Sequence, residues 1–344
     1  MSNVMKKMPE KTAARRRPRG EHIPVEGENG LFTESWFAIC PSQEIPAGTI
    51  AGKEFLDGRV VVFRDESGMA HVLSARCCHL GTDLAIGTVV DNQIRCAFHH
   101  WLYNSDGCCV KTGWGEPGPK NARLFKFPTV EKFGLIWAFN GENAWWDLPD
   151  CQFPDHELST EVYYDVPLMP VDPWVVCANT PDWSHFKFVH HVIFDEIDAS
   201  SRYQFTDHSL EFKLKGVMFD GKGPALELDV GIYGTTMFYF QGTLDGEWYA
   251  LMSAFGMPRP GFTQNYFSFS VQSGDGSPEA QAKVKALHAA GYQLGKVFTA
   301  MDRPIMHNIN YTPGILTRQD EALSRYLEIV RRFPRSHASG DFIR

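Results

Sequence analysis

The sequence has no apolar run near the roughly 20 residues that a membrane-spanning helix needs, and segment 134–139 is typical of what it has. It also lacks excess positive charge: the formal net charge is −8 at pH 7, which argues against a nucleic-acid partner. No apolar segment follows the basic N-terminus, so we expect no secretory signal. The eight cysteines are therefore expected to be free thiols or metal ligands rather than disulfides. Together these absences favour a cytoplasmic protein that binds neither membrane nor nucleic acid.

The length and composition suit two folded domains. The chain has 344 residues, of which 43% are hydrophobic and 22% charged, as in an ordinary globular protein. Residues 1–30 begin with a basic segment and are expected to form a disordered tail. Residues 31–145 show short strands and turns, which predict a small all-β domain. Residues 146–344 mix strand and helix patterns, so the second domain is expected to be α+β.

A few segments carry most of this secondary-structure prediction. Residues 59–63 form a continuous apolar run typical of a buried strand, and residues 87–96 read as a hairpin with an Asp-Asn turn. Apolar alternation over 210–214 predicts a half-buried strand. Ser277 followed by a proline is a helix start, and the helix is expected to end near Met301 because of the downstream Pro304.

The first cluster of metal-binding residue types lies in the predicted all-β domain. Cys77 and His79 form a C-x-H motif, and after sixteen residues Cys96 and His99 form C-x-x-H. Two thiolates and two imidazoles suit either tetrahedral zinc or a Rieske [2Fe-2S] cluster. Zinc fingers pair cysteine with cysteine and histidine with histidine, whereas each motif here carries one of each. The spacing therefore favours the cluster, with both cysteines on one iron and both histidines on the other.

The flanking residues resemble Rieske proteins as well. Leu80-Gly81 follows the first motif and Trp101 the second. Respiratory-chain Rieske proteins carry two further cysteines that form a disulfide between the loops, but Thr82 and Phe98 occupy those positions here. The resemblance therefore implies a cluster of the ferredoxin or oxygenase kind. His100 stands where the family has glycine and could compete for iron, although His99 has the better spacing.

A second cluster follows in the predicted α+β domain. The segment 179–191 reads N-x-x-D-x-x-H-x-x-x-x-H and then a further histidine. His185 and His190 would point about 140° apart on a regular helix, so they converge only if the helix ends or bulges between them. The zinc-protease pattern H-E-x-x-H is absent.

This segment resembles the catalytic segment of Rieske non-haem iron oxygenases, and with the first cluster the resemblance covers nearly the whole chain after the tail. It implies a helix-grip fold for the second domain, in which an antiparallel sheet wraps a long C-terminal helix. It also implies that His185, His190 and a distant aspartate hold a mononuclear Fe(II) with open coordination positions. Asp302 is the favoured third ligand, and the other candidates are Asp195, Asp198 and Asp320. His191 could exchange with His190.

Two further residues gain roles from the resemblance. Asp182 matches an acid that bridges a cluster histidine of one subunit to an iron histidine of the next. That role implies a homotrimer, in which His79 or His99 supplies the cluster side. Asn179 matches an asparagine near the iron, although a helix N-cap is an equally good interpretation of it.

The expected function is that of a terminal oxygenase component. It would use O₂ and electrons that a separate NAD(P)H-dependent reductase, with or without a ferredoxin, passes through the [2Fe-2S] cluster to the Fe(II). The reductase must be separate because the chain has no G-x-G-x-x-G motif. The aromatic-rich second domain predicts an apolar, aromatic or polycyclic small-molecule substrate.

The chain length resembles single-component members of the family, which favours monooxygenation: hydroxylation, demethylation or N-oxygenation. Two alternatives stay open. One is dioxygenation of an aromatic ring, and the other is a Rieske electron-transfer protein without catalytic activity.

Overall fold

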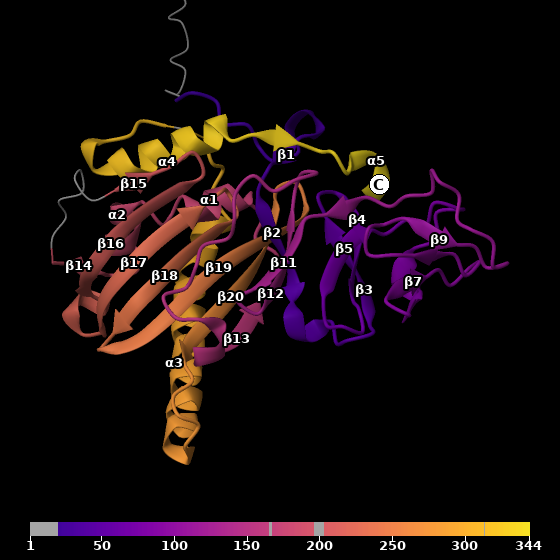
Figure 1. Ribbon diagram of the computed structural model, residues 1–344. Coiled ribbons are helices and arrows are strands. Elements are labelled where there is room, and N and C mark those ends of the chain that lie inside the picture. The colour runs from indigo at the N-terminus through magenta and orange to yellow at the C-terminus, as the bar shows by residue number, and fades with distance from the viewer. Residues whose placement is uncertain (1–19, 165–166, 196–202, 313) are drawn as a thin grey trace, which may run out of the picture.

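The computed structural model describes residues 20–164, 167–195, 203–312 and 314–344. The basic segment 1–19 lies outside the described residues. The remaining chain forms two parts that lie side by side, a group of small sheets and one large sheet with a long helix (Figure 1).

The N-terminal part is built from three small antiparallel sheets, with strand orders β10-β5-β4-β3, β11-β12-β2 and β6-β7-β8-β9. The strands are β2 (Trp36–Pro41), β3 (Ile50–Phe55), β4 (Gly58–Arg64), β5 (Ala70–Ser74), β6 (Thr88–Val90), β7 (Gln93–Arg95), β8 (Leu102–Tyr103), β9 (Cys109–Lys111), β10 (Lys126–Phe127), β11 (Thr129–Lys132) and β12 (Leu135–Phe139). Asp91 and Asn92 have positive φ angles of 49° and 61°, which a two-residue hairpin turn of this kind requires.

The C-terminal part is built on one antiparallel sheet of eight strands, in the order β13-β20-β19-β18-β17-β16-β14 with β15 also paired to β16. Its strands are β13 (Leu158–Tyr164), β14 (Ile193–Phe194), β15 (Gln204–Phe205), β16 (Ser209–Val217), β17 (Ala225–Tyr233), β18 (Met237–Leu244), β19 (Glu247–Arg259) and β20 (Phe262–Gln272). In β16, Leu210, Phe212 and Leu214 are buried while Lys213 and Lys215 are exposed, so the alternation in the sequence places one face of the sheet in the core.

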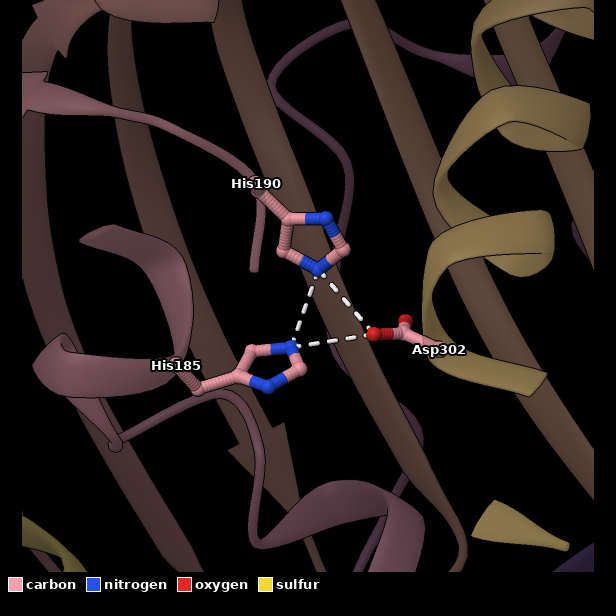
Figure 2. Close-up of side chains that lie close together, drawn as sticks. All are labelled: His185, His190 and Asp302. Atoms are coloured by element: carbon pink, nitrogen blue, oxygen red, sulfur yellow. Dashed lines mark hydrogen bonds and ion pairs between the residues drawn. The ribbon is translucent and has the colours of Figure 1, made fainter. Parts of the chain in front are cut away.

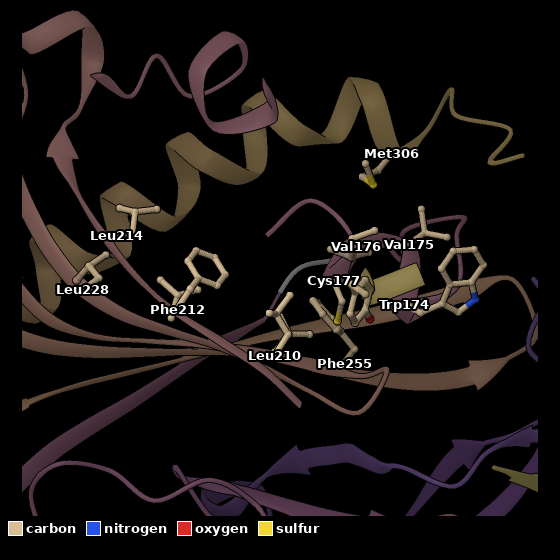
Figure 3. Packing of buried hydrophobic residues seen from close by; sticks show 14 of the residues in the cluster. Trp174, Val175, Val176, Cys177, Leu210, Phe212, Leu214, Leu228, Phe255 and Met306 are labelled. Atoms are coloured by element: carbon tan, nitrogen blue, oxygen red, sulfur yellow. The ribbon is translucent and has the colours of Figure 1, made fainter. Parts of the chain in front are cut away.

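The helices are α1 (Pro173–Cys177), α2 (Trp183–Phe188), α3 (Pro278–Met306), α4 (Glu321–Arg332) and α5 (Gly340–Ile343). The longest of them, α3, packs against β20 and β13, and Figure 3 shows Leu214 and Leu228 beneath it with Met306 at its C-terminal end. The predicted end near Met301 is wrong. Pro304 lies in the last turn, where its missing N–H removes only one helical hydrogen bond, and the His307 N–H closes the helix by donating to the Arg303 carbonyl.

The end of the chain returns to the N-terminal part. β21 (Arg335–Ser336) pairs with β1 (Phe32–Thr33), and α5 packs beside β4 (Figure 1). Ile343 is 1% exposed, in one hydrophobic cluster with Phe32 and Phe55. The approach is close: a Cβ atom on Gly58 would lie 2.5 Å from the Ile343 side chain. Residues far apart in the sequence therefore complete one core.

The architecture confirms the predicted fold class of an all-β N-terminal domain and an antiparallel sheet that wraps a long helix. The domain boundaries at residues 30 and 145 stay predictions. Among the described residues, no helix is long and apolar enough to cross a membrane.

Candidate metal centres

The first centre is formed by two loops with matching backbone geometry. In the first loop, the Gly81 N–H donates to the Cys77 carbonyl and the Cys77 N–H donates to the Thr82 carbonyl. In the second loop, the His100 N–H donates to the Cys96 carbonyl and the Cys96 N–H to the Trp101 carbonyl. Gly81 and His100 occupy equivalent positions with φ angles of 75° and 55°. This left-handed geometry explains why a glycine is expected at position 100.

The four candidate ligands lie in two pairs. The His79 Nδ1 and His99 Nδ1 atoms are 3.1 Å apart. The Cys77 and Cys96 thiols are both buried, and burial raises the pKa of Cys77, with the adjacent Cys96 thiol adding to the effect. Ligands of one zinc ion lie at most about 4.6 Å apart, twice the Zn–S distance. No three of these four described residues have donor atoms within 4.8 Å of one another. The arrangement therefore fits a two-iron cluster better than a single zinc ion.

Two aromatic residues support this centre. The Tyr103 hydroxyl lies 3.1 Å from the Cys77 sulfur and also accepts a hydrogen bond from the Cys78 N–H. The Trp101 ring stacks on His79, with the centroids 4.6 Å apart and the planes at 5°. Tyr103 is fully buried and is a residue that the sequence interpretation missed. The sequence signal that could have pointed to Tyr103 is its position in the short strand directly after the second motif.

All eight cysteines are free, so no disulfide joins the two loops. Phe98, at one of the positions that would carry such a disulfide, is 59% exposed. Cys78 is exposed and lies between the two candidate ligands of the first loop without joining the cysteine pair.

The second centre is formed where α2 ends. The helix stops at Phe188, so His190 leaves the helical path and turns back toward His185. The two Nε2 atoms are 2.9 Å apart, and each lies 3.2 Å from Oδ1 of Asp302 on α3 (Figure 2). The donor atoms of these three residues all lie within 4.8 Å of one another, which is close enough for one metal ion to bind all three.

The donor atoms of this trio fit a metal ion. The Asp302 Oδ1 atom is buried and makes no well-directed hydrogen bond, although both imidazoles are near it. Burial alone would raise the pKa of Asp302, but the two imidazoles of His185 and His190 beside it hold that pKa below the ordinary value of 3.8. Two imidazoles and one carboxylate that converge on a common point form the ligand set typical of non-haem iron with open positions.

The other candidate ligands lie elsewhere. The Asp195 N–H donates to the Lys215 carbonyl at the edge of the sheet. The Asp320 carboxylate accepts hydrogen bonds from the Thr317 N–H and hydroxyl, in the capping box of the 3-10 turn (Arg318–Asp320) that precedes α4. Asp198 lies outside the described residues. His191 has a φ angle of 53° and points toward Asp220, with its Nδ1 atom 3.7 Å from that carboxylate.

Asp182 is the N-cap of α2: its Oδ1 atom accepts a hydrogen bond from the His185 N–H at 3.0 Å. The N-cap interpretation of Asn179 is therefore wrong, because Asp182 takes that role. Asn179 lies in the turn between α1 and α2, and its Nδ2 atom is buried without a partner among the described residues.

An apolar pocket adjoins the trio, between the large sheet and α3. It holds about 1160 Å³ of space, part of it open to solvent, and Phe238, Phe240, Phe267 and Phe298 are among its walls. His185, His190 and Asp302 also line it, so a molecule in the pocket would reach the metal ligands. The sequence interpretation expected such a pocket from the aromatic content of this domain.

Comparison with known proteins classifies the part of the chain that contains the first candidate centre. Residues 35–128 match the model of the Rieske [2Fe-2S] domain. This part of the chain is a Rieske domain. Chlorophyllide a oxygenase of Chlamydomonas reinhardtii is 33% identical over 181 residues, which are 52% of this chain but only 27% of that protein.

Solved structures extend the likeness across both parts of the chain. NdmA of Pseudomonas putida CBB5 with caffeine superposes with a TM-score of 0.66 at 18% identity, over 86% of this chain and 89% of NdmA. Dicamba monooxygenase bound to dicamba gives a TM-score of 0.64 at 18% identity, over 87% and 97%. At this identity the likeness establishes the fold. The relatives and structural neighbours are Rieske non-haem iron oxygenases, which confirms the resemblance drawn from the sequence.

Proposed function

We propose that this chain is the terminal oxygenase component of a Rieske non-haem iron system that monooxygenates an apolar small molecule. The observation that carries the proposal is the convergence of His185, His190 and Asp302 beside an apolar pocket, in a chain that also has a Rieske domain. An electron carrier alone would need neither the second ligand set nor the pocket.

Each of the two domains would hold one of the two cofactors. Cys77, Cys96, His79 and His99 would hold the [2Fe-2S] cluster, while His185, His190 and Asp302 would hold Fe(II). When bound, the cluster supplies electrons one at a time and the iron supplies a place where O₂ is activated.

The protein around the second centre would orient the reactants. Asp182 fixes the start of α2 and with it the backbone of His185. The phenylalanine-rich walls would bury the substrate and exclude bulk water from the reacting groups. Asn179, with its unpartnered Nδ2 atom in the same pocket, would offer a hydrogen-bond donor near the ligands.

The positions of the two centres support transfer of electrons between subunits. β7 and the loops beside it lie at the far end of the molecule from α2 (Figure 1). His79 is exposed, and Leu80 and Phe98 beside the cluster loops are 65% and 59% exposed, which suits contact with another chain. We therefore propose a homotrimer in which Asp182 of one copy meets a cluster histidine of the next. A separate NAD(P)H-dependent reductase, with or without a ferredoxin, would reduce the cluster.

The proposed site of action is the cytoplasm, where reduced thiols persist, and the eight free cysteines support it. Dioxygenation of an aromatic ring is the alternative chemistry for the same centre. Product analysis under ¹⁸O₂ distinguishes the two, because a dioxygenase places both labelled atoms in the product.

The deciding experiment compares the protein with His185→Ala. We expect the variant to keep the Rieske absorption spectrum, to lose the iron beyond the cluster, and to form no product with a surrogate reductase. The matched control is His191→Ala, which removes the neighbouring histidine that faces Asp220 and should retain the cluster, the mononuclear iron and activity. Product formation by His185→Ala at the unaltered rate would support the non-catalytic electron-transfer alternative.

A further inference from the structure

Besides Asn179 and the candidate metal ligands, two side chains that line the apolar pocket carry a buried polar atom without a partner among the described residues. Ser253 on β19 is fully buried and Asn265 on β20 is 6% exposed. The Ser253 Oγ and the Asn265 Oδ1 make no hydrogen bond within the described residues. A buried polar atom without a partner costs free energy, so such atoms in a binding pocket point to a ligand that satisfies them.

Both side chains face the pocket from the same side of the sheet. Ser253 pairs with Phe267 across β19 and β20, and Asn265 lies two residues before Phe267. Diagonal neighbours of this kind lie about 7 to 8 Å apart, so one polar group between them can reach both. The two residues line the pocket together with the metal ligands.

Two hydroxyls on the opposite face of the sheet, in β20, do have partners. The Ser268 hydroxyl donates to the Phe133 carbonyl, and the Ser270 hydroxyl pairs with Thr160 at 2.8 Å. The chain therefore satisfies the buried hydroxyls that serve the protein core. Ser253, which faces the pocket, is left for another partner.

The charge of the pocket restricts that partner. Apart from the proposed Fe(II), whose charge Asp302 partly offsets, the described lining residues include no lysine or arginine. A ligand carboxylate held at Ser253 and Asn265 would therefore have no side-chain cation to pair with, and its burial would cost much more than burial of an amide or a hydroxyl. The wall formed by Ser253 and Asn265 thus suits an uncharged group that both donates and accepts hydrogen bonds.

We infer that the substrate of the proposed oxygenase is a neutral, largely apolar molecule whose single amide-like or hydroxyl group is bound by Ser253 and Asn265. The inference rests on the proposed function for its chemistry but concerns recognition alone. It makes these two residues determinants of specificity, since they discriminate between a polar group and an apolar group of the same shape.

The test measures binding to the intact, iron-loaded protein without O₂ or reductase, so it does not depend on turnover. The probes are 2-naphthamide, 2-naphthoate and 2-methylnaphthalene, which share a ring system and differ in one substituent. We expect naphthamide to bind about threefold to tenfold more tightly than methylnaphthalene, and naphthoate to bind most weakly. Ser253→Ala and Asn265→Leu should each remove most of the naphthamide preference and leave methylnaphthalene binding unchanged.

Ser268→Ala is the matched control, because it removes a hydroxyl from the opposite face of the sheet. It should leave naphthamide binding intact and lower Tm, whereas Ser253→Ala should keep Tm or raise it. Naphthoate binding as tight as that of naphthamide, or an unchanged preference in both pocket variants, would overturn the inference. A protein that holds no mononuclear iron but still shows the preference would refute the proposed function and leave this inference standing.

Discussion

Gly295 allows a quantitative test of the pocket beside α3. It lies inside the helix, where glycine is less stable than alanine by about 1 kcal/mol. A Cβ atom built on it would meet no atom within 4 Å, and the residue lines the pocket. We therefore expect Gly295→Ala to raise the free energy of unfolding by about 1 kcal/mol, since the added methyl group enters open space.

Gly291, one turn earlier, is the matched control. A Cβ atom there would lie 2.5 Å from the Phe269 ring, so the ring must move. Overpacking of this kind costs about 1 to 3 kcal/mol, which offsets or exceeds the gain in helix propensity. The two alanine variants should therefore differ in stability by about 1 to 3 kcal/mol although their helix propensities are the same.

The assay is urea unfolding followed by circular dichroism, combined with naphthamide binding. With an m-value near 3 kcal/mol/M, Gly295→Ala should shift the midpoint upward by about 0.3 M. Gly295→Leu should fill the space and weaken naphthamide binding at least tenfold. The reasoning is refuted if Gly295→Ala destabilises the protein as much as Gly291→Ala, or if Gly295→Leu binds naphthamide normally.

Three further predictions concern single contacts. Asp302→Ala should lose the mononuclear iron and product formation while Asp195→Ala keeps both, as metal analysis and product assays would show. Tyr103→Phe removes a hydrogen bond to the Cys77 sulfur. Because such a bond contributes about 1 kcal/mol, which is about 40 mV for one electron, the variant should lower the reduction potential of the cluster by about that amount in a redox titration. Burial raises the pKa of Glu26 to about 7 despite the opposing charge of Arg335, so the folded protein keeps a proton that the unfolded chain loses above its ordinary pKa of 4.5. Stability should therefore fall by roughly 3 kcal/mol as the pH rises from 4.5 to 7, and Glu26→Gln should reduce that fall in urea unfolding.

For each of these three predictions, one result would contradict the reasoning. Iron retention by Asp302→Ala would remove that residue from the ligand set. An unchanged potential in Tyr103→Phe would mean that the hydroxyl does not act on the bound cluster. A stability profile of Glu26→Gln that parallels the unaltered protein would assign the pH dependence to other groups.

The sequence was most informative where spacing reflects local geometry. The two Cys/His motifs predict two matching loops, and the structure has them. In each loop the N–H of the fourth residue after the cysteine donates a hydrogen bond to the cysteine carbonyl and closes a turn. His185 and His190 could not converge on a continuous helix, and the helix ends between them. Asp302 lies over a hundred residues away, so its place at the site came from the resemblance and not from periodicity.

Other features depend on tertiary contacts that no local pattern contains. Tyr103 pairs with Ile94 in the hairpin of the second loop, yet its hydroxyl contacts Cys77 in the first loop. Ser253 and Asn265 look like ordinary strand residues, and only the absence of partners on their face of the sheet sets them apart. The end of α3 was misjudged because the cost of proline depends on how much helix follows it.

The return of the chain end to β1 and β4 also affects the order of events during synthesis. The family match of the N-terminal domain ends at residue 128, yet Ile343 belongs to that domain's core. At about 5 to 20 residues per second, the ribosome needs roughly 10 to 40 s to make the intervening segment. During that interval the place of Ile343 in this core stays unfilled, so the core of the N-terminal part is completed only after the C-terminal part has been made. In the proposed oxygenase, the core beside the cluster domain would then be completed only after the residues that line the pocket had been synthesised.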